Sequence, residues 1–582
     1  MITCCVFGFF FHKFCNLRKC SPLTRHAISF FVGYLIAFFC YGIRSGHLLA
    51  MASTVYLLLH IFSPKRAFWT SFLFCITYSS WAHLYRMKFD YGGYSADVSL
   101  PLMVLVQRLT LLAANLVDGH EIIAASKKKD VDKEGPLYSN GHIPKGSITS
   151  KLTPIQKEYA VLQMPTPVEF FSYCINFQTV LAGPPLAFKD YRVYIEGTEA
   201  DDKHLTTKQR AEFIKNRDTL LQPMNEILKY FLQAVTFLIV YLCICQFFRP
   251  SFYLSEAFGR FEFFHKCFYL MFTGFTMRQH YYFAWSVCAL SCLAAGLGFR
   301  GFDKHGKPDY SLVKSFNFME AEFPRSVKEL TDNWNLQTLR WLRITVFDRT
   351  PKNIAVFAVF FVSVLWHGFY PGYYLFFVSM AWFSVIGRMV RKRLRPRILE
   401  WLPDTKLVWT PEGQREGTSR AYDLITRVVT YFLVNYTALA FVILSFRESI
   451  IAWSRFNYAG HLLCLVTQLL ILILLPSSKS SPLPSASKTK KVLTTIYISS
   501  VTVIHISIKL TPSLVRLFLF TPSPLLACVC VCPGVGFGIV GCSSLSANSL
   551  PVANCCYENL VFLFGLCFLL ISYAAPTYSP FQ

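Results

Sequence analysis

Charged side chains are scarce in this chain: Asp, Glu, Lys and Arg make up 15% of its 582 residues, whereas hydrophobic residues make up 53%. Soluble domains carry about 25% charged residues, so a set of soluble domains fits this composition poorly. The deficit lies in recurring apolar runs that approach the roughly 20 residues needed to cross a bilayer. Backbone amides in lipid must be satisfied within their own segment, so these runs predict helices. We therefore expect an all-α, polytopic membrane protein.

Signatures of the common soluble enzymes are missing as well. No G-x-S-x-G nucleophile elbow pairs with a plausible catalytic triad, and neither a phosphate-binding loop nor a dinucleotide-binding fingerprint is present. The 20 cysteines stand mostly singly within apolar runs, where a free thiol behaves as a small hydrophobe, and none shows metal-ligand spacing with histidine. We expect no disulfide framework, no metal site and no bound cofactor.

Acidic residues are outnumbered by basic ones, which gives the chain a formal net charge of +24. The lysines and arginines gather between the apolar runs, a distribution typical of cytoplasmic loops and of contact with anionic lipid. Nucleic acid, a common partner of basic soluble proteins, is the weaker interpretation, and we expect none. Three polar stretches are predicted to be cytosolic loops: residues 118–165, 187–222 and 388–420.

The apolar runs predict about eleven transmembrane helices. Several of the runs are shorter than an ideal span, and short, interrupted segments often line an internal cavity. The candidate spans are residues 28–43, 47–62, 67–84, 98–117, 168–186, 227–248, 264–276, 281–298, 354–366, 371–387, 425–446 and 459–475.

The two ends of the chain differ from its middle, and they divide it into a lead-in (1–26), a core (27–475) and a tail (476–582). The tail contains a single acid, Glu558, and an alternating Cys-Val run from Cys528 to Cys532, which a TG dinucleotide repeat would encode. We interpret the tail as translated intron or repeat sequence. The rival interpretation is extra spans near 492–508, 513–531 and 560–574.

A single ionisable residue, His367, lies in the apolar stretch from Val356 to Met380. Ionisable groups within a membrane are costly, so they are candidates for function. Removal from water favours the neutral imidazole, which can accept a proton. A core histidine bonded to a neighbouring helix explains the residue equally well at this point, although Gly368, Pro371 and Gly372 interrupt the helix directly after it.

A compact polar and aromatic motif, Thr331 to Trp341, precedes that stretch. An asparagine here, Asn335, could orient a substrate hydroxyl or carbonyl, or stabilise a developing oxyanion. The tryptophans Trp334 and Trp341 are better explained as an interfacial belt at the level of the lipid headgroups.

At these two motifs the chain resembles the membrane-bound O-acyltransferase family, and within it the lysophospholipid acyltransferase branch. The resemblance covers roughly residues 27 to 475. Asn317 and Glu322 stand where that branch carries an asparagine and a glutamate. The matching strings are Trp334-Asn335-Leu336-Gln337-Thr338, Leu365-Trp366-His367-Gly368-Phe369-Tyr370-Pro371-Gly372-Tyr373-Tyr374, Leu181-Ala182-Gly183-Pro184, Phe188-Lys189-Asp190-Tyr191, Ile195-Glu196-Gly197 and Tyr281-Tyr282-Phe283-Ala284-Trp285.

The resemblance implies a helical fold around a buried chamber, acyl-CoA as co-substrate, a lysophospholipid as acceptor and a multi-pass location in the endoplasmic reticulum membrane. It also implies His367 and Asn335 as the catalytic residues, with His367 as general base. The candidates for substrate binding are Trp334, Gln337, Asn317, Glu322, Tyr373 and Tyr374.

Three alternatives remain open. A sister enzyme could acylate a protein or a sterol, although the strings Tyr373-Tyr374 and Tyr281 to Trp285 argue against it. A transporter could use His367 in a proton relay, but it should show internal repeats, and none is evident. An inactive relative could serve as a structural partner, although both expected residues are present. The sequence sets neither the headgroup, acyl-chain and glycerol-position preference nor the oligomeric state.

Overall fold

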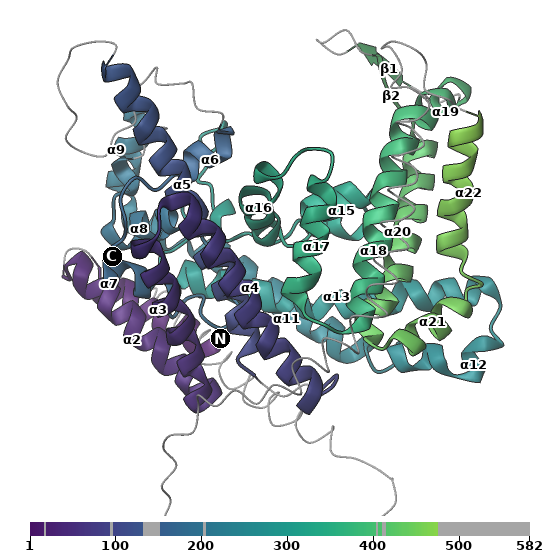
Figure 1. Ribbon diagram of the computed structural model, residues 1–582, viewed down its shortest axis with the longest axis horizontal. Coiled ribbons are helices and arrows are strands. Elements are labelled where there is room, and N and C mark those ends of the chain that lie inside the picture. The colour runs from purple at the N-terminus through teal and green to yellow at the C-terminus, as the bar shows by residue number, and fades with distance from the viewer. Residues whose placement is uncertain are drawn as a thin grey trace, which may run out of the picture. The chain divides into compact units, whose positions relative to one another are not determined.

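The computed structural model describes residues 1–16, 19–93, 97–131, 152–201, 205–402, 406–409 and 415–474. All of these lie within one compact unit, Met1–Ser507. This part of the chain is almost entirely helical (Figure 1), which confirms the predicted fold class. The only sheet in the described ranges is an antiparallel hairpin in the 388–420 loop, β1 (Lys406–Trp409) with β2 (Arg415–Thr418). The predicted tail spans lie outside the described residues.

The helices of the described residues fall into two groups along the chain. The first group is α1 (Ile2–Phe14), α2 (Pro22–Tyr41), η1 (Gly42–Ser45), α3 (Gly46–Ile61), α4 (Pro64–Phe89), α5 (Ser99–Val131), α6 (Pro154–Tyr159), α7 (Pro167–Cys174), α8 (Phe188–Glu196), η2 (Glu199–Asp201), α9 (Thr207–Lys215), α10 (Arg217–Leu221) and α11 (Met224–Ile244). The second group is η3 (Pro250–Leu254), α12 (Glu256–Gly259), α13 (Phe263–Ala294), η4 (Ser311–Val313), α14 (Phe318–Glu322), α15 (Val327–Asn333), α16 (Leu336–Thr345), η5 (Phe347–Arg349), α17 (Ala355–His367), α18 (Pro371–Met389), the π-helix η6 (Val390–Leu394), α19 (Arg395–Trp401), α20 (Arg420–Ile443), α21 (Phe446–Ser454) and α22 (Ala459–Leu474).

Five helical segments in the described residues are long and apolar enough to cross a membrane, and a sixth is obtained if the helix pair Phe446–Ser454 and Ala459–Ile473, bent by 74°, counts as one span. The polytopic prediction is therefore confirmed, but the predicted number of about eleven spans is not. The five segments are Pro22–Ile61, Ser99–Lys127, Arg217–Ile244, Pro371–Glu400 and Arg420–Ile443.

Three of the predicted spans are wrong in detail. Residues 168–186 form only the short helix α7, after which the chain turns irregularly through Asn176 and Gly183 toward Pro184. Residues 264–276 and 281–298 are not two spans, because a single helix of 32 residues, α13, covers most of both. The polar residues between the two predicted spans lie in the middle of that helix.

Two predicted loops are also more ordered than expected. α5 continues to Val131, so the stretch 118–165 begins as helix, and Asp118 on it is fully buried. The stretch 187–222 contains α8, η2, α9 and α10, and Tyr191 and Ile195 on α8 are buried in the main core. Apolar residues at helical spacing within these polar stretches give each segment a buried face.

The lead-in is a helix packed against the core. α1 contacts α13, and its Phe11 is 1% exposed, with its ring 5.3 Å from that of Phe177. Cys4 and Cys5 are buried in the same contact.

α5 occupies the centre of the main core, whereas α11 lies at its margin. In the most apolar window of each span, 83% of the residues are buried for Ser99–Lys127 but only 22% for Arg217–Ile244. A membrane helix that is buried on all sides contacts protein rather than lipid, so its polar side chains need partners within the protein. α5 contacts α3, α4, α7 and α16, and its polar residues bond to several of them.

Candidate active site

The two sequence motifs lie on four helices that contact one another in series. α15 contacts α16, α16 contacts α17, α17 contacts α18, and α18 returns to α15. Asn335 precedes α16 and His367 ends α17. The rings of Trp341 on α16 and Trp366 on α17 lie 5.8 Å apart, so the two motifs meet inside the protein.

One face of α5 fixes both motifs. Gln107 donates to the hydroxyl of Thr338 at 2.9 Å, and Thr110 accepts from the indole of Trp341 at 2.8 Å. The carbonyl of Met103 accepts from the indole of Trp366 at 2.9 Å. Positions 103, 107 and 110 follow the i, i+4, i+7 pattern of one helix face. A single rigid helix therefore sets the position of α16 relative to α17.

Asn335 has an unusual backbone conformation, with φ 48° and ψ 60° in the left-handed region. Asparagine tolerates this region better than most residues. Its side-chain oxygen accepts a 3.3 Å hydrogen bond from the backbone N–H of Thr338, which caps the start of α16. Because a backbone N–H can only donate, the capping atom is the oxygen, and the amide nitrogen Nδ2 remains as a donor. The residue is partly exposed.

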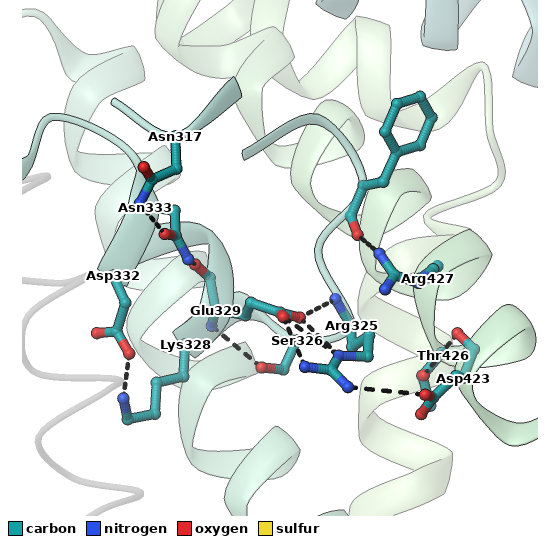
Figure 2. A network of polar contacts seen from close by, with 11 residues as sticks. Asn317, Arg325, Ser326, Lys328, Glu329, Asp332, Asn333, Asp423, Thr426 and Arg427 are labelled. Carbon is teal, nitrogen blue, oxygen red and sulfur yellow. Dashed lines mark hydrogen bonds and ion pairs between the residues drawn. The ribbon is translucent and has the colours of Figure 1, made fainter. Parts of the chain in front are cut away.

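Backbone contacts from the preceding segment hold the Asn335 turn. The N–H of Leu336 donates to the carbonyl of Ser315 at 2.8 Å, and the N–H of Asn317 donates to the carbonyl of Asn333 at 3.0 Å. The side chain of Asn317 also donates to that of Asn333 at 2.6 Å (Figure 2). This placement favours a positioning role for Asn317 over contact with substrate.

Glu322 is fully buried and forms an ion pair with Arg278 in the middle of α13. Its two oxygens accept from Nε and Nη2 of Arg278 at 2.7 and 2.6 Å, and the hydroxyl of Tyr282 donates to it at 2.7 Å. Arg278 also donates to Asn435 on α20 at 2.6 Å. A buried charge needs such a partner. Glu322 therefore ties the segment that leads to Asn335 to α13 and α20.

A second polar network lies on the exposed side of α15 (Figure 2). Arg325 donates to Glu329 at 2.9 Å and lies 3.7 Å from Asp423 of α20, while Lys328 pairs with Asp332. Partial burial raises the pKa of Glu329, but hydrogen bonds from Arg325 outweigh this effect, so its pKa lies below the ordinary value. The carboxylate is thus ionised at neutral pH and keeps its bonds to Arg325.

The interpretation of the tryptophans as an interfacial belt is wrong for Trp341. Trp341 is fully buried, and Trp334 packs against Tyr281 and Trp285 of α13, with ring centroids 5.7 and 4.8 Å away. Both indoles find aromatic partners inside the protein, and that of Trp341 also donates to Thr110, so burial of these large rings is favourable. Gln337 is 2% exposed and donates to the carbonyls of Leu312 and Lys314, which favours a positioning role for it.

His367 is the last residue of α17, and its ring orientation is defined by its own helix. Nδ1 lies 2.7 Å from the carbonyl of Ser363. A carbonyl only accepts, so Nδ1 carries the hydrogen and Nε2 is the nitrogen that can take up a proton. The ring is surrounded by Trp366, Phe377 and Phe441, at centroid distances of 4.6, 4.9 and 5.5 Å. It is partly exposed within this aromatic enclosure.

The turn after His367 depends on two glycines. Gly368 has φ +118°, a conformation that side chains rarely adopt. Gly372 approaches α20 so closely that a Cβ would collide with the carbonyl of Ala440, and its N–H donates to the carbonyl of Leu444 at 2.7 Å. Tyr373 lies 6.1 Å from His367 ring to ring, and both it and Tyr374 are partly exposed.

Sequence reasoning missed Arg278, which lies between two apolar runs that were predicted as separate spans. The signal was present, because a charged residue in an apolar stretch predicts either function or a buried partner. Only the tertiary structure brings Glu322 to it. Among the described residues, no group of three or more His, Cys, Asp and Glu side chains is placed to hold a metal ion.

These features define a polytopic helical membrane protein with an asparagine at the start of one helix, α16, and a histidine at the end of a neighbouring helix, α17. The sequence model of the membrane-bound O-acyltransferase family matches residues 48–404, and the chain belongs to this family.

Relatives resemble the chain over most of its length. It is 32% identical over 472 residues to membrane-bound glycerophospholipid O-acyltransferase 2 of Mus musculus, covering 81% of this chain and 82% of the relative. It is 27% identical to lysophospholipid acyltransferase 6 of Drosophila melanogaster, covering 78% and 58%. It is 25% identical to lysophospholipid acyltransferase of Schizosaccharomyces pombe, covering 77% and 80%.

Proposed function

We propose that this protein is a lysophospholipid O-acyltransferase, which moves a fatty acyl group from acyl-CoA to the free hydroxyl of a lysophospholipid in phospholipid remodelling. The family match and the names of the relatives support the reaction class. The observation that carries the mechanism is the His367 ring, whose Nδ1–H bonds to Ser363 and leaves Nε2 to accept a proton within the protein.

In the proposed reaction, Nε2 of His367 is the general base. It takes the proton of the lysophospholipid hydroxyl while the oxygen attacks the thioester carbonyl carbon. The C–O ester bond forms, the C–S bond breaks, and the proton leaves with the sulfur as free CoA. Proton transfer by a positioned side chain contributes about 10²–10⁴-fold to the rate.

Asn335 acts through its amide nitrogen. Its oxygen already caps α16, so Nδ2 is the group available to a substrate. A donor of this kind stabilises the negative charge that develops on the thioester oxygen, which is worth about 10²–10³-fold. The cap fixes this donor before substrate arrives, so little reorganisation accompanies the reaction.

Aromatic side chains around both residues supply a dry environment. Phe377 and Phe441 adjoin His367, and Trp334 and Trp285 adjoin the Asn335 turn. Exclusion of water strengthens the electrostatic contacts and limits hydrolysis of the thioester. Trp334, Tyr373 and Tyr374 remain predicted substrate contacts, and the endoplasmic reticulum remains the predicted membrane.

The test uses microsomes that contain the full chain, supplied with oleoyl-CoA and a panel of lysophospholipids with different headgroups. Formation of diacyl product above that of microsomes without the chain supports the proposal, and the panel identifies the headgroup. If no lysophospholipid is acylated, the proposal fails. Acylation of a protein or sterol in the same microsomes, or proton-coupled transport, would then be the function to pursue.

A further inference from the structure

A second histidine, His83, lies against the turn that carries His367. It belongs to α4, about 280 positions earlier in the sequence, and is 8% exposed. Its Nε2 lies 3.1 Å from the carbonyl of Trp366, the residue directly before His367. The contact joins α4 to the end of α17, two helices that pack together.

The carbonyl of Trp366 needs a partner from outside its helix. The last four carbonyls of a helix have no intrahelical donor, and a buried carbonyl without a donor is costly. α17 ends at His367, and the last helical bond runs from the N–H of Gly368 to Val364. Because a carbonyl only accepts, His83 is the donor, with its hydrogen on Nε2.

The His83 ring also lies close to Gly368, the residue directly after His367. A Cβ built on Gly368 would lie 3.2 Å from Cγ and 3.3 Å from Nδ1 of His83. The absence of a side chain at Gly368 therefore lets the His83 ring approach the backbone there. One imidazole thus bonds to the residue before His367 and lies beside the residue after it, and it fixes the peptide to which His367 is attached.

We propose that His83 is a positioning residue for catalysis, which holds the His367 backbone through its hydrogen bond to Trp366 so that Nε2 of His367 faces the substrate. This inference rests on the proposed function. The Ser363 bond orients the imidazole relative to α17, whereas His83 orients the end of α17 relative to α4. A displacement of about 1 Å at a reacting group can lower the rate about 10²-fold.

The experiment compares His83→Gln, His83→Asn and His83→Phe in the full chain. The amide nitrogen of glutamine has nearly the reach of imidazole Nε2, whereas that of asparagine corresponds to Nδ1. We expect His83→Phe and His83→Asn to lower kcat about 10–10²-fold per folded molecule with little change in KM, and His83→Gln to restore most of the loss.

A matched control is His47→Phe. His47 on α3 bonds to the hydroxyl of Tyr78 at 2.7 Å, and Tyr78 lies on α4, the helix that carries His83. Removal of the His47 imidazole therefore deletes a similar histidine contact to α4, away from the turn at His367. We expect its kcat to remain at the wild-type level.

The outcomes are distinct. Equal kcat for wild type, His83→Gln and His83→Asn overturns the positioning role, as does a His83→Gln variant that is folded but no better than His83→Asn. If His83→Phe does not fold, the Gln and Asn pair decides the question. Wild-type chain that acylates no lysophospholipid contradicts the proposed function itself, whatever the variants do.

Discussion

Asn335 and His367 both lie at helix ends, but different parts of the protein hold them. Asn335 supports its own turn, since it adopts the left-handed conformation and caps α16 with its side chain. The turn at His367 is supported by other residues: His83, Gly368 and the α20 backbone that approaches Gly372. A substitution at Asn335 that loses both the left-handed conformation and the cap therefore changes structure and chemistry together, whereas a substitution at His367 should change mainly chemistry.

The largest effect is expected for His367→Ala. Loss of the general base should lower kcat by about 10²–10⁴-fold. The fold should remain, because the hydrogen bond that the imidazole makes within the described residues runs to Ser363 of its own helix. The measurement is product formation per amount of folded protein in microsomes. Wild-type activity at equal abundance would show that His367 is structural and that the proposed mechanism is wrong.

Glu322→Ala tests the buried ion pair with Arg278 that holds the segment leading to Asn335. Removal of one partner of a buried ion pair costs about 3–5 kcal/mol, because Arg278 stays buried with an unpaired charge. We expect a strong loss of thermal stability in detergent, with the KM of the remaining folded protein changed less than about threefold. Lys328→Ala, which removes the exposed pair with Asp332, is the control and should leave stability unchanged. A large rise in KM without loss of stability would instead indicate substrate contact by Glu322.

Asn335→Gly separates structure from chemistry at the same turn. Glycine adopts the left-handed conformation freely, and at an N-cap it costs only a few tenths of a kcal/mol relative to asparagine. We expect a stable protein whose kcat is lower by about 10²–10³-fold, because the amide donor is gone.

Asn335→Asp is its companion variant. The carboxylate keeps the acceptor for the Thr338 N–H but has no amide donor. It should therefore be stable and as poorly active as the glycine variant. Normal activity of either variant would remove the oxyanion role from Asn335.

The smallest effect is expected for Gly368→Ala. The φ of +118° strains any side chain, at a cost of about 1–3 kcal/mol. The added Cβ would also press on the His83 ring, so both stability and kcat should fall. Gly387→Ala, in an open position on α18, is the control and should be neutral or slightly stabilising. Equal behaviour of the two variants in a thermal melt would show that the turn tolerates side chains.

Much of the site could be predicted from residues that differ in type from their neighbours in the sequence. His367 was the one ionisable residue in an apolar stretch, and the glycines and proline after it predicted the turn that ends α17. The residues that hold the His367 turn in place could not be predicted in this way. His83 lies in a helix with other polar residues, and its relation to Trp366 depends on the packing of α4 against α17.

The sequence by itself determined the class of protein. Lipid admits only segments whose backbone groups hydrogen-bond to one another, and the apolar runs that form such segments can be identified directly in the sequence. The sequence also predicted the helix end that carries His367, whereas the helix that begins after Asn335 was found only in the structure. Tertiary structure alone decided the number of spans, the pairing of Arg278 with Glu322 and the burial of Trp341. A charge or an aromatic ring takes its role from the partner opposite it, and partners far apart in the chain meet only when the helices have packed.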